Sequence, residues 1–153
     1  MVDSPIEVRT LTLDQIEQAY ALIGSCSPSV SLADWRQFAT RLIRSEMDSP
    51  CPSGVVVAVN PAGRLRGTYS FWMKTCPQQH ERLLVVAHLA IPLFGRRRVA
   101  EVLRDQMMRT AIACHCKAIH AQVFLDCDWN LSFFKDCDYE IEIIPVRMIE
   151  VED

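Results

Sequence analysis

Residues 83–125 constrain the fold of this chain more than any other part, because they place a helical pattern between two apolar runs. Leu83–Ile91 is apolar nearly throughout, which is typical of a strand covered on both faces. Val99 to about Cys114 carries apolar residues at three-to-four spacing, and Ala118–Leu125 has the composition of a second strand. A strand, helix, strand crossover is right-handed and joins parallel strands. The sequence therefore predicts an α/β domain with Leu83–Ile91 as a central strand.

The remaining segments predict further helices and strands around this crossover. They are, in chain order, a strand at Ile6–Leu11, a helix from Leu13 that Gly24 ends, a helix capped by Ser31 that ends near Ser45, an antiparallel hairpin of Val55–Val59 with Leu65–Met73, a short helix around Asn130–Lys135, and strands within Tyr139–Val151. Apolar residues at helical spacing and a Pro-then-Gly turn support these assignments. Thr12 and Gln15 form a predicted capping box before the first helix.

Length and composition predict one domain that spans residues 1–153. Half of the residues are hydrophobic (50%), and a chain of this length buries roughly 70% of the surface that its unfolded form exposes. The formal net charge of -3 gives no reason to expect nucleic acid or an anionic membrane as a partner. No disulfide or metal is needed to explain folding.

The cysteines and the start of the chain predict a cytoplasmic protein. The chain has seven cysteines, an odd number, and its first ten residues, MVDSPIEVRT, lack the basic and apolar regions of a secretion signal. The longest apolar runs are far shorter than the ~20 residues that span a bilayer. We therefore expect reduced thiols in a soluble, cytoplasmic domain.

A basic loop precedes the long predicted helix of the crossover. Pro92 ends the central strand, and the loop Gly95–Arg98 then places three arginines at the helix start. Unpaired backbone N–H groups and the positive end of the helix dipole form an anion site at such a start. Arginines there are mildly unfavourable without an anion. We therefore expect the amides of Arg96–Ala100 to bind an anionic ligand.

Two stretches resemble segments of the GCN5-related N-acetyltransferase (GNAT) superfamily. Residues 90–100, AIPLFGRRRVA, match the acyl-CoA segment of that family in the proline, in the spacing from proline to loop, and in the small residue Ala100. Residues 133–139, FFKDCDY, are similar to the late segment of the family, with its aromatic pair, short turn and closing aromatic. With the order of elements, the resemblance covers nearly the whole chain. It implies an α+β fold with a mixed, mostly antiparallel central sheet, a splayed parallel strand pair and flanking helices.

The sequence departs from the family pattern at three positions. Gly95 stands where the family loop begins with Gln or Arg, and Arg98 replaces the inner glycine. A side chain at Arg98 either crowds the phosphates or binds one of them directly. Phe134 stands where the family often has the tyrosine that protonates the departing thiolate.

The resemblance implies a transferase that moves an acetyl or acyl group from acetyl-CoA to an amine. The backbone of Leu89, Ala90 and Ile91 is expected to pair with the pantetheine arm. The loop and helix start, which comprise Gly95, Arg96, Arg97, Arg98, Val99 and Ala100, are expected to bind the pyrophosphate, and Asn130 is a further polar contact. The amine attacks the thioester directly, and a backbone N–H near Leu89 polarises the carbonyl oxygen. No metal is implied.

Three residues are candidates for proton transfer. His88, in the central strand, and Glu81, just before it, are candidate general bases, and Tyr139 is a candidate acid for the thiolate. Each has a structural alternative: a packed core histidine, a surface carboxylate beside Arg82, and a tyrosine that packs in the core. An ordinary thiol has a pKa near ~8.5, so its thiolate also leaves unassisted.

Other functions remain open at the level of sequence. Cys114-His115-Cys116 suggests a metal site, but its ligands are too close together for the usual zinc spacing. Cys127 lies between two aspartates, which raise the pKa of a thiol and disfavour a nucleophile. A non-catalytic acyl-CoA-binding module and an acyltransferase with a longer-chain or carrier-protein donor are the main alternatives. The amine acceptor is not identified, and Trp129, Phe133 and Phe134 serve either the core or a homodimer.

Overall fold

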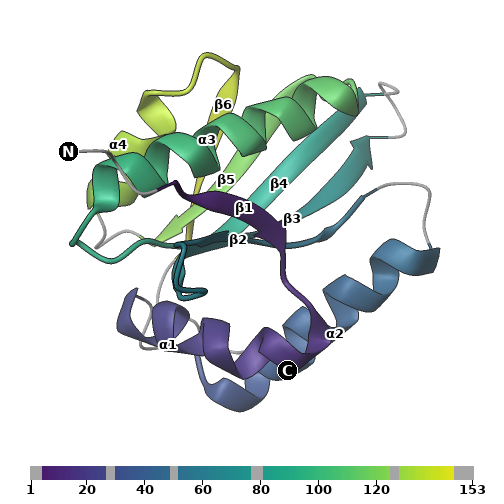
Figure 1. The fold of residues 1–153 in the computed structure, drawn as a ribbon. Helices are drawn as coiled ribbons and strands as arrows, with labels where there is room; N and C mark the ends of the chain where they lie inside the picture. Colours follow the sequence, from purple (N-terminus) through teal and green to yellow (C-terminus); the bar gives the residue numbers. More distant parts are fainter. Residues whose placement is uncertain (1–4, 27–29, 49–51, 77–80, 125–127, 147–153) are drawn as a thin grey trace.

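The structure, a computed structural model, describes residues 5–26, 30–48, 52–76, 81–124 and 128–146. Its elements follow the chain in this order: β1 (Glu7–Thr10), the short 3-10 helix η1 (Leu13–Gln15), α1 (Ile16–Cys26), α2 (Leu32–Asp48), β2 (Gly54–Val59), β3 (Leu65–Cys76), β4 (Glu81–Ala90), α3 (Arg96–Ala113), β5 (Ala118–Phe124), α4 (Asp128–Lys135) and β6 (Ile141–Val146) (Figure 1). The strands form one six-stranded sheet in sequence order. The pairs from β1 to β4 are antiparallel, and those from β4 to β6 are parallel. The predicted mixed sheet is confirmed.

Helices cover both faces of the sheet. Helices α1 and α2 pack on one face, where Trp35 and Ala39 join a hydrophobic cluster with valines of β2. Helices α3 and α4 pack on the other face, where Leu103, Met107 and Phe133 join the second cluster (Figure 1). Strand β4 is buried from Leu84 to Ala87 because it lies between these two layers, as its apolar sequence predicts.

The start of α2 confirms a prediction, and the end of α1 corrects one. Ser31 caps α2, since its Oγ accepts a hydrogen bond of 3.1 Å from the N–H of Asp34. Helix α1 does not end at Gly24 but continues to Cys26. Tyr20, one turn earlier, lies over Gly24 and donates a hydrogen bond of 2.7 Å to the carbonyl of Val30. This contact joins the last turn of α1 to the segment that follows.

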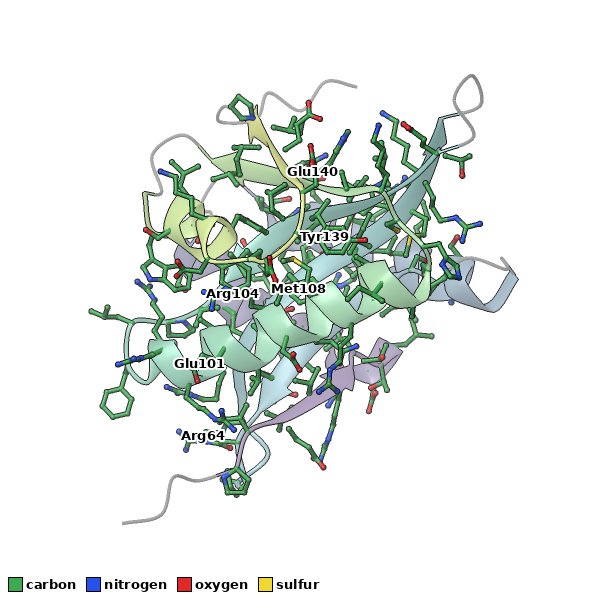
Figure 2. The ribbon with its side chains drawn as sticks, turned by 90° about the horizontal axis from the view of Figure 1, so that it is seen from above. Arg64, Glu101, Arg104, Met108, Tyr139 and Glu140 are labelled. Carbon is green, nitrogen blue, oxygen red and sulfur yellow. The ribbon has the colours of Figure 1, made fainter. Side chains whose placement is uncertain are left out.

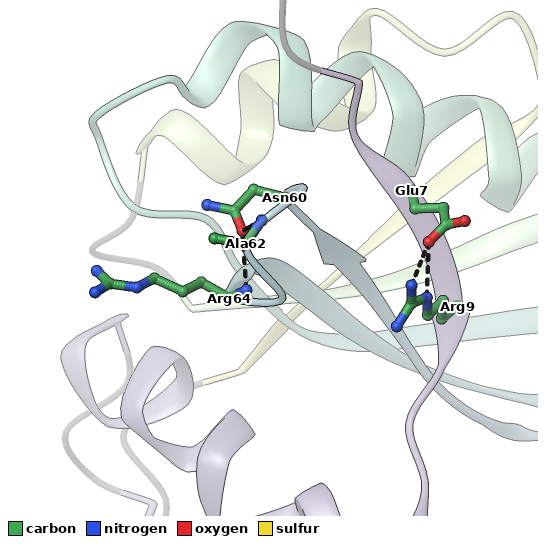
Figure 3. A network of polar contacts seen from close by, with 5 residues as sticks. All are labelled: Glu7, Arg9, Asn60, Ala62 and Arg64. Atoms are coloured by element: carbon green, nitrogen blue, oxygen red, sulfur yellow. Dashed lines mark hydrogen bonds and ion pairs between the residues drawn. The ribbon is translucent and has the colours of Figure 1, made fainter.

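The predicted hairpin of β2 and β3 is present, and a side chain organises its turn (Figure 3). The Oδ1 of Asn60 accepts hydrogen bonds from the N–H groups of Ala62 at 3.0 Å and Arg64 at 2.9 Å. On the neighbouring β1, Arg9 Nε donates to Glu7 Oε1 at 2.9 Å. The turn of the hairpin is therefore fixed locally and places β3 beside β2.

The end of the chain is described only in part. Of the strands predicted within Tyr139–Val151, β6 is present, and residues 147–151 lie outside the described residues, as does Leu125. None of the helices in the described part of the chain is long and apolar enough to cross a membrane.

Candidate functional site

Strand β4 carries one extra residue near its carboxyl end. Thr68 and Ser70 of β3 are two residues apart, but their partners Ala90 and Ala87 are three residues apart. The surplus residue falls at His88, whose φ of 55° is in the left-handed region. Two residues of β4 therefore lie opposite one residue of β3. This irregularity is a β-bulge, a feature often found beside active sites.

The core packing on the α3 face shows the same shift. Before the bulge Leu84 and Val86 join the cluster under α3, and after it Leu89 and Ile91 do so. The change from even to odd positions requires one additional residue between Val86 and Leu89. His88 consequently contacts α2, on the opposite face of the sheet.

The parallel strands β4 and β5 separate beside the bulge. Their pairing runs from Leu83 with Ala118 to Val86 with Ala121 and ends there. Beyond this point β5 pairs only with β6, as far as Phe124, and β4 pairs only with β3. The splayed parallel pair that the resemblance implies is therefore present, and it opens at the carboxyl ends of both strands.

Side chains from α3 and α4 reach the end of β4 at this opening. Asn130 of α4 is buried, and its Nδ2 lies 3.4 Å from the carbonyl oxygen of Leu89. Arg96 of α3 donates to the carbonyl oxygen of Ile91 through Nη2 at 2.9 Å and Nε at 3.2 Å. Two of the three residues expected to pair with a pantetheine arm thus already have internal hydrogen-bond donors on their carbonyls.

Helix α3 begins with a glycine in the left-handed conformation. Gly95 is the N-cap with φ 69°, and its carbonyl accepts a hydrogen bond of 3.5 Å from the N–H of Val99. Within the described residues, the backbone N–H groups of Arg97 and Arg98 have no acceptor. They lie at the positive end of the helix dipole, where the sequence predicts an anion site.

The three consecutive arginines have different roles. Arg96 turns inward, where its guanidinium lies 4.2 Å from the ring centroid of Trp129. Arg97 and Arg98 stay at the surface, 3.9 Å and 3.6 Å from the carboxylate of Glu101. The side chain of Arg97 is 96% exposed, so only its weak contact with Glu101 competes with a bound anion.

Two hollows meet at these arginines. The first, of about 590 Å³, lies at the start of α3 and is lined by Leu93, Gly95, Arg96, Arg97, Arg98 and Glu101. The second, of about 440 Å³, lies between α3 and α4 and is lined by Arg96, Arg97, Ala100, Glu101, Arg104, Trp129 and Asp136. Because they share three residues, they form one surface that is both cationic and close to the strand opening.

Three residues of this surface were not predicted from the sequence to belong to the site. Arg104 points from α3 toward α4 (Figure 2), where its Nε donates to the carbonyl of Phe133 at 3.0 Å and its guanidinium lies 4.8 Å from the ring centroid of Phe133. Trp129 stacks with Arg96, and Glu101 faces Arg97 and Arg98. The signal for Glu101 was available, since a carboxylate three and four residues after arginines pairs with them on a helix.

His88 is the one candidate base that lies at the bulge. Its ring centroid lies 4.8 Å from that of Phe38 and 5.5 Å from that of Trp35, both on α2. Its Nδ1 is buried and has no hydrogen-bond partner among the described residues. Burial lowers the pKa of His88 from 6.5 to about 4, so the imidazole is neutral at neutral pH.

We expect this burial to make stability depend on pH. The folded pKa of His88, about 4, lies below the unfolded value of 6.5. The stability that depends on neutral His88 is therefore fully present above pH 6.5 and is lost as pH falls toward 4. The free energy of unfolding should fall by about 2 kcal/mol from about pH 7 to about pH 5 through this residue. Urea unfolding of the wild type and the His88→Gln variant checks this. Parallel pH curves for the two proteins would contradict the buried, neutral histidine.

The other two candidate proton-transfer residues lie elsewhere. Glu81 begins β4 and pairs with Lys117 at 2.7 Å, seven positions before His88. Tyr139 lies before β6, and its hydroxyl donates to the carbonyl of Cys116, just before β5 begins (Figure 2). Burial and then Cys116 raise the pKa of Tyr139. The structure therefore places His88, the loop and Asn130 near the carboxyl end of β4, with the His88 ring on the α2 face, and it places Glu81 and Tyr139 at the opposite end of the strands.

The residues of the late aromatic segment lie in the core. Phe133 and Phe134 are each 1% exposed, and their rings meet edge to face with centroids 5.0 Å apart. Burial raises the pKa of the Cys137 thiol to about 11, so this thiol is protonated at neutral pH. In the described ranges no three His, Cys, Asp or Glu side chains gather as metal ligands, and Cys127 lies outside those ranges.

Solved structures of other proteins share the fold of this chain. No family model and no curated protein matches the sequence. Among solved structures, an aminoglycoside N-acetyltransferase in complex with CoA matches with a TM-score of 0.72 and 13% identity, over 99% of this chain and 97% of that one. Glucosamine-6-phosphate N-acetyltransferase from Arabidopsis thaliana matches with a TM-score of 0.67 and 15% identity, over 97% and 99% of the two chains.

The name of a third matching protein states a different acceptor. The ribosomal-protein-alanine N-acetyltransferase from Brucella melitensis matches with a TM-score of 0.66 and 16% identity, over 92% of this chain and 98% of that one. The three proteins span nearly their full length in each alignment. The chain therefore has the GNAT fold.

Proposed function

We propose that this protein transfers an acetyl or acyl group from acetyl-CoA to an amine. The neutral amine nitrogen attacks the thioester carbonyl carbon, and a new C–N bond forms. The C–S bond then breaks, the thiolate of CoA leaves, and the nitrogen loses one proton. The GNAT fold and the CoA bound to one structural neighbour support the donor.

The arrangement of residues 87–98 is the observation that carries the proposal. A bulge, the open edge of a strand and a helix N-terminus follow one another within this segment. An extended donor can pair with the strand edge, place its phosphates at the N–H groups of Arg97 and Arg98, and place its thioester at the bulge. We propose that a backbone N–H group at the bulge polarises the thioester oxygen, as an oxyanion hole does.

Among the candidate general bases, the geometry favours His88, which contributes little to deprotonation of the amine. A neutral imidazole with an unpartnered Nδ1 can accept a proton, directly or through one water. Its low pKa, about 4, makes it a weak base that positions a water or the amine more than it drives deprotonation. We therefore expect the reaction to speed up as pH rises and more of the amine is neutral.

Neither of the two late aromatic positions supplies an acid to the leaving thiolate in this proposal. Phe134 is buried in the core, and Tyr139 lies at the far end of β5. The thiol of CoA resembles an ordinary thiol, with a pKa near ~8.5, so its thiolate can leave and take a proton from water. We expect turnover to be slow but measurable.

A non-catalytic acyl-CoA-binding module is a second candidate. It is favoured by the internal hydrogen bonds to the carbonyls of Leu89 and Ile91, which a donor has to replace. Such a module binds the donor without releasing thiol when amines are added. Measurement of thiol release beside binding separates the two functions.

Calorimetric titration with acetyl-CoA, desulfo-CoA and a pantetheine analogue without pyrophosphate tests the donor site. We expect binding of both CoA species and at least a tenfold loss for the pantetheine analogue, because the helix start binds the pyrophosphate. Failure of every CoA species to bind would reject acetyl-CoA as the donor. It would shift support to a carrier-protein donor.

Charge variants on α3 locate the phosphates. Arg98→Glu should weaken CoA binding by at least tenfold, and Glu101→Gln should strengthen it, because Glu101 competes with the phosphates for Arg97 and Arg98. Arg109→Glu is the matched control on the same helix, where Arg109 pairs with Asp105 at 2.9 Å, far from the helix start. Equal losses in Arg98→Glu and Arg109→Glu would mean that the effect is net charge alone.

We further propose a reducing, cytoplasmic location. Within the described residues, Cys114 and Cys137 form no disulfide. The proposal rests on the odd number of cysteines in the sequence, which predicts reduced thiols.

A further inference from the structure

A cavity of about 370 Å³ lies between α2 and the end of β3, on the face of the sheet opposite α3. Its lining residues are Phe38, Arg41, Leu42, Ser45, Pro52, Ser53, Trp72 and Met73. Most of this surface is apolar, and two aromatic rings form part of the wall. The volume is at the lower end of the range for small-molecule sites, so the cavity suits a compact molecule.

Aromatic contacts connect this cavity to the bulge. The ring centroid of Phe38 lies 5.8 Å from that of Trp72 and 4.8 Å from that of His88. Trp72 lines the cavity, and His88 has the buried Nδ1 without a partner. A single aromatic side chain, Phe38, therefore lines the cavity and also contacts the histidine at the bulge.

A second buried polar atom lies on this face. Ser70 pairs with Ala87, directly beside the bulge, and its Oγ is buried without a partner among the described residues. Its neighbours Tyr69 and Phe71 belong to the α3 cluster, so alternation places Ser70 on the face that α2 covers. Buried polar atoms are rarely left unpaired, and two of them at the bulge indicate a polar group or water that binds there.

Arg41 supplies a charge at the cavity. It is exposed, and no carboxylate among the described residues pairs with it. By contrast, Arg36 on the same helix pairs with Glu17 at 2.7 Å. The hydroxyl of Ser45 also lines the cavity beside Arg41. An arginine without a partner beside an apolar cavity is suited to an anionic group on a bound molecule.

The spacing of these features sets the shape of that molecule. Arg41 follows Phe38 by three positions on α2, so their Cβ atoms are about 5–6 Å apart. The ring centroid of His88 lies 4.8 Å from that of Phe38. A molecule with a polar group at each end of a ring-sized apolar body suits a cavity that has Arg41 on its wall, an aromatic lining and the bulge beside Phe38.

We propose that this cavity binds the acceptor, and that the acceptor is a small aromatic or apolar amine with an anionic group at the end opposite the amine. The inference rests on the proposed acyl transfer, since it names the substrate class of the same site. Arg41 binds the anion, Phe38 and Trp72 pack against the apolar body, and the amine points toward His88. A free α-amino acid fits less well because one carbon separates its amine from its carboxylate.

Acetylation of matched amines tests the proposal. Thiol release from acetyl-CoA is measured with para-aminomethylbenzoate, with benzylamine, which lacks the anion, and with phenylalanine, which is an α-amino acid. We expect kcat/KM for para-aminomethylbenzoate to exceed that for the other two by at least tenfold. The Arg41→Gln variant should remove the advantage over benzylamine. Arg44→Gln is the control, because Arg44 lies on α2 but does not line this cavity, and it should keep the advantage.

Calorimetric binding of para-aminomethylbenzoate separates this inference from the proposed function. Binding by the wild type and by Arg44→Gln, with at least a tenfold loss in Arg41→Gln, supports the site even if no thiol is released. In that case acyl transfer is the hypothesis that fails. Equal kcat/KM for para-aminomethylbenzoate and benzylamine, or wild-type binding that Arg41→Gln does not weaken, would overturn the inference.

Discussion

The Trp35→Ala variant is expected to lower the free energy of unfolding by about 3–5 kcal/mol, as large-to-small changes of buried tryptophans do. Trp35 is 0% exposed, and its indole Nε1 donates a hydrogen bond of 2.8 Å to the carbonyl of Ile16. Alanine leaves a cavity between α1, α2 and the sheet, and it leaves that carbonyl without its donor. Urea unfolding followed by circular dichroism measures the loss.

Trp35→Phe separates packing from the hydrogen bond. It keeps an aromatic ring beside Phe38 and His88, so the loss should be smaller than for alanine. Arg36→Ala is the surface control, since the salt bridge of Arg36 with Glu17 is exposed and contributes little. A loss below about 1 kcal/mol for Trp35→Ala would mean that α2 is not packed as described.

The Gly67→Val variant is expected to destabilise the protein by about 3 kcal/mol and to weaken donor binding at the same time. A Cβ at Gly67 would lie 2.7 Å from Val99 Cγ1, 3.0 Å from Leu103 Cδ1 and 3.3 Å from Ile91 Cγ1. Val99 and Leu103 belong to the first turns of α3, so a side chain at Gly67 pushes the helix start away from the sheet. The anion site moves with it.

Two readouts distinguish this effect from a general loss of stability. Urea unfolding measures the destabilisation, and calorimetric titration with desulfo-CoA, at a temperature where the variant is folded, measures the donor site. Gly24→Ala is the matched glycine control, because its Cβ would lie 3.4 Å from the ring of Tyr20, close to an ordinary contact, inside a helix. If folded Gly67→Val binds desulfo-CoA as the wild type does, the helix start is not the donor site.

The sequence predicts most of the fold because its strongest patterns are local. The apolar run of β4, the three-to-four spacing of α3 and the turn chemistry of β2 and β3 each depend on neighbours in the chain. The prediction for Gly24 was wrong because a tertiary contact decides the end of α1. Tyr20 packs over the glycine and binds the carbonyl of Val30, and no local rule contains that bond.

The candidate site is predicted less completely, since its details depend on contacts between distant segments. Positions 96, 97 and 98 are all arginine, yet only Arg96 turns inward, toward Ile91 and Trp129. The bulge at His88 exists only in relation to β3, so a single strand cannot reveal it. Tyr139 follows the late aromatic pair closely in the sequence, but the path of the chain carries it to the opposite end of β5.

The short segment between the bulge and the N-cap of α3 determines which length of donor arm fits the site. Seven positions separate His88 from Gly95, and the covalent chain between them limits how far apart the two ends of the site lie. A donor therefore needs an arm of one length to place its thioester at the first end and its phosphates at the second. Insertion or deletion of a single residue in this segment would change which acyl carriers the protein accepts.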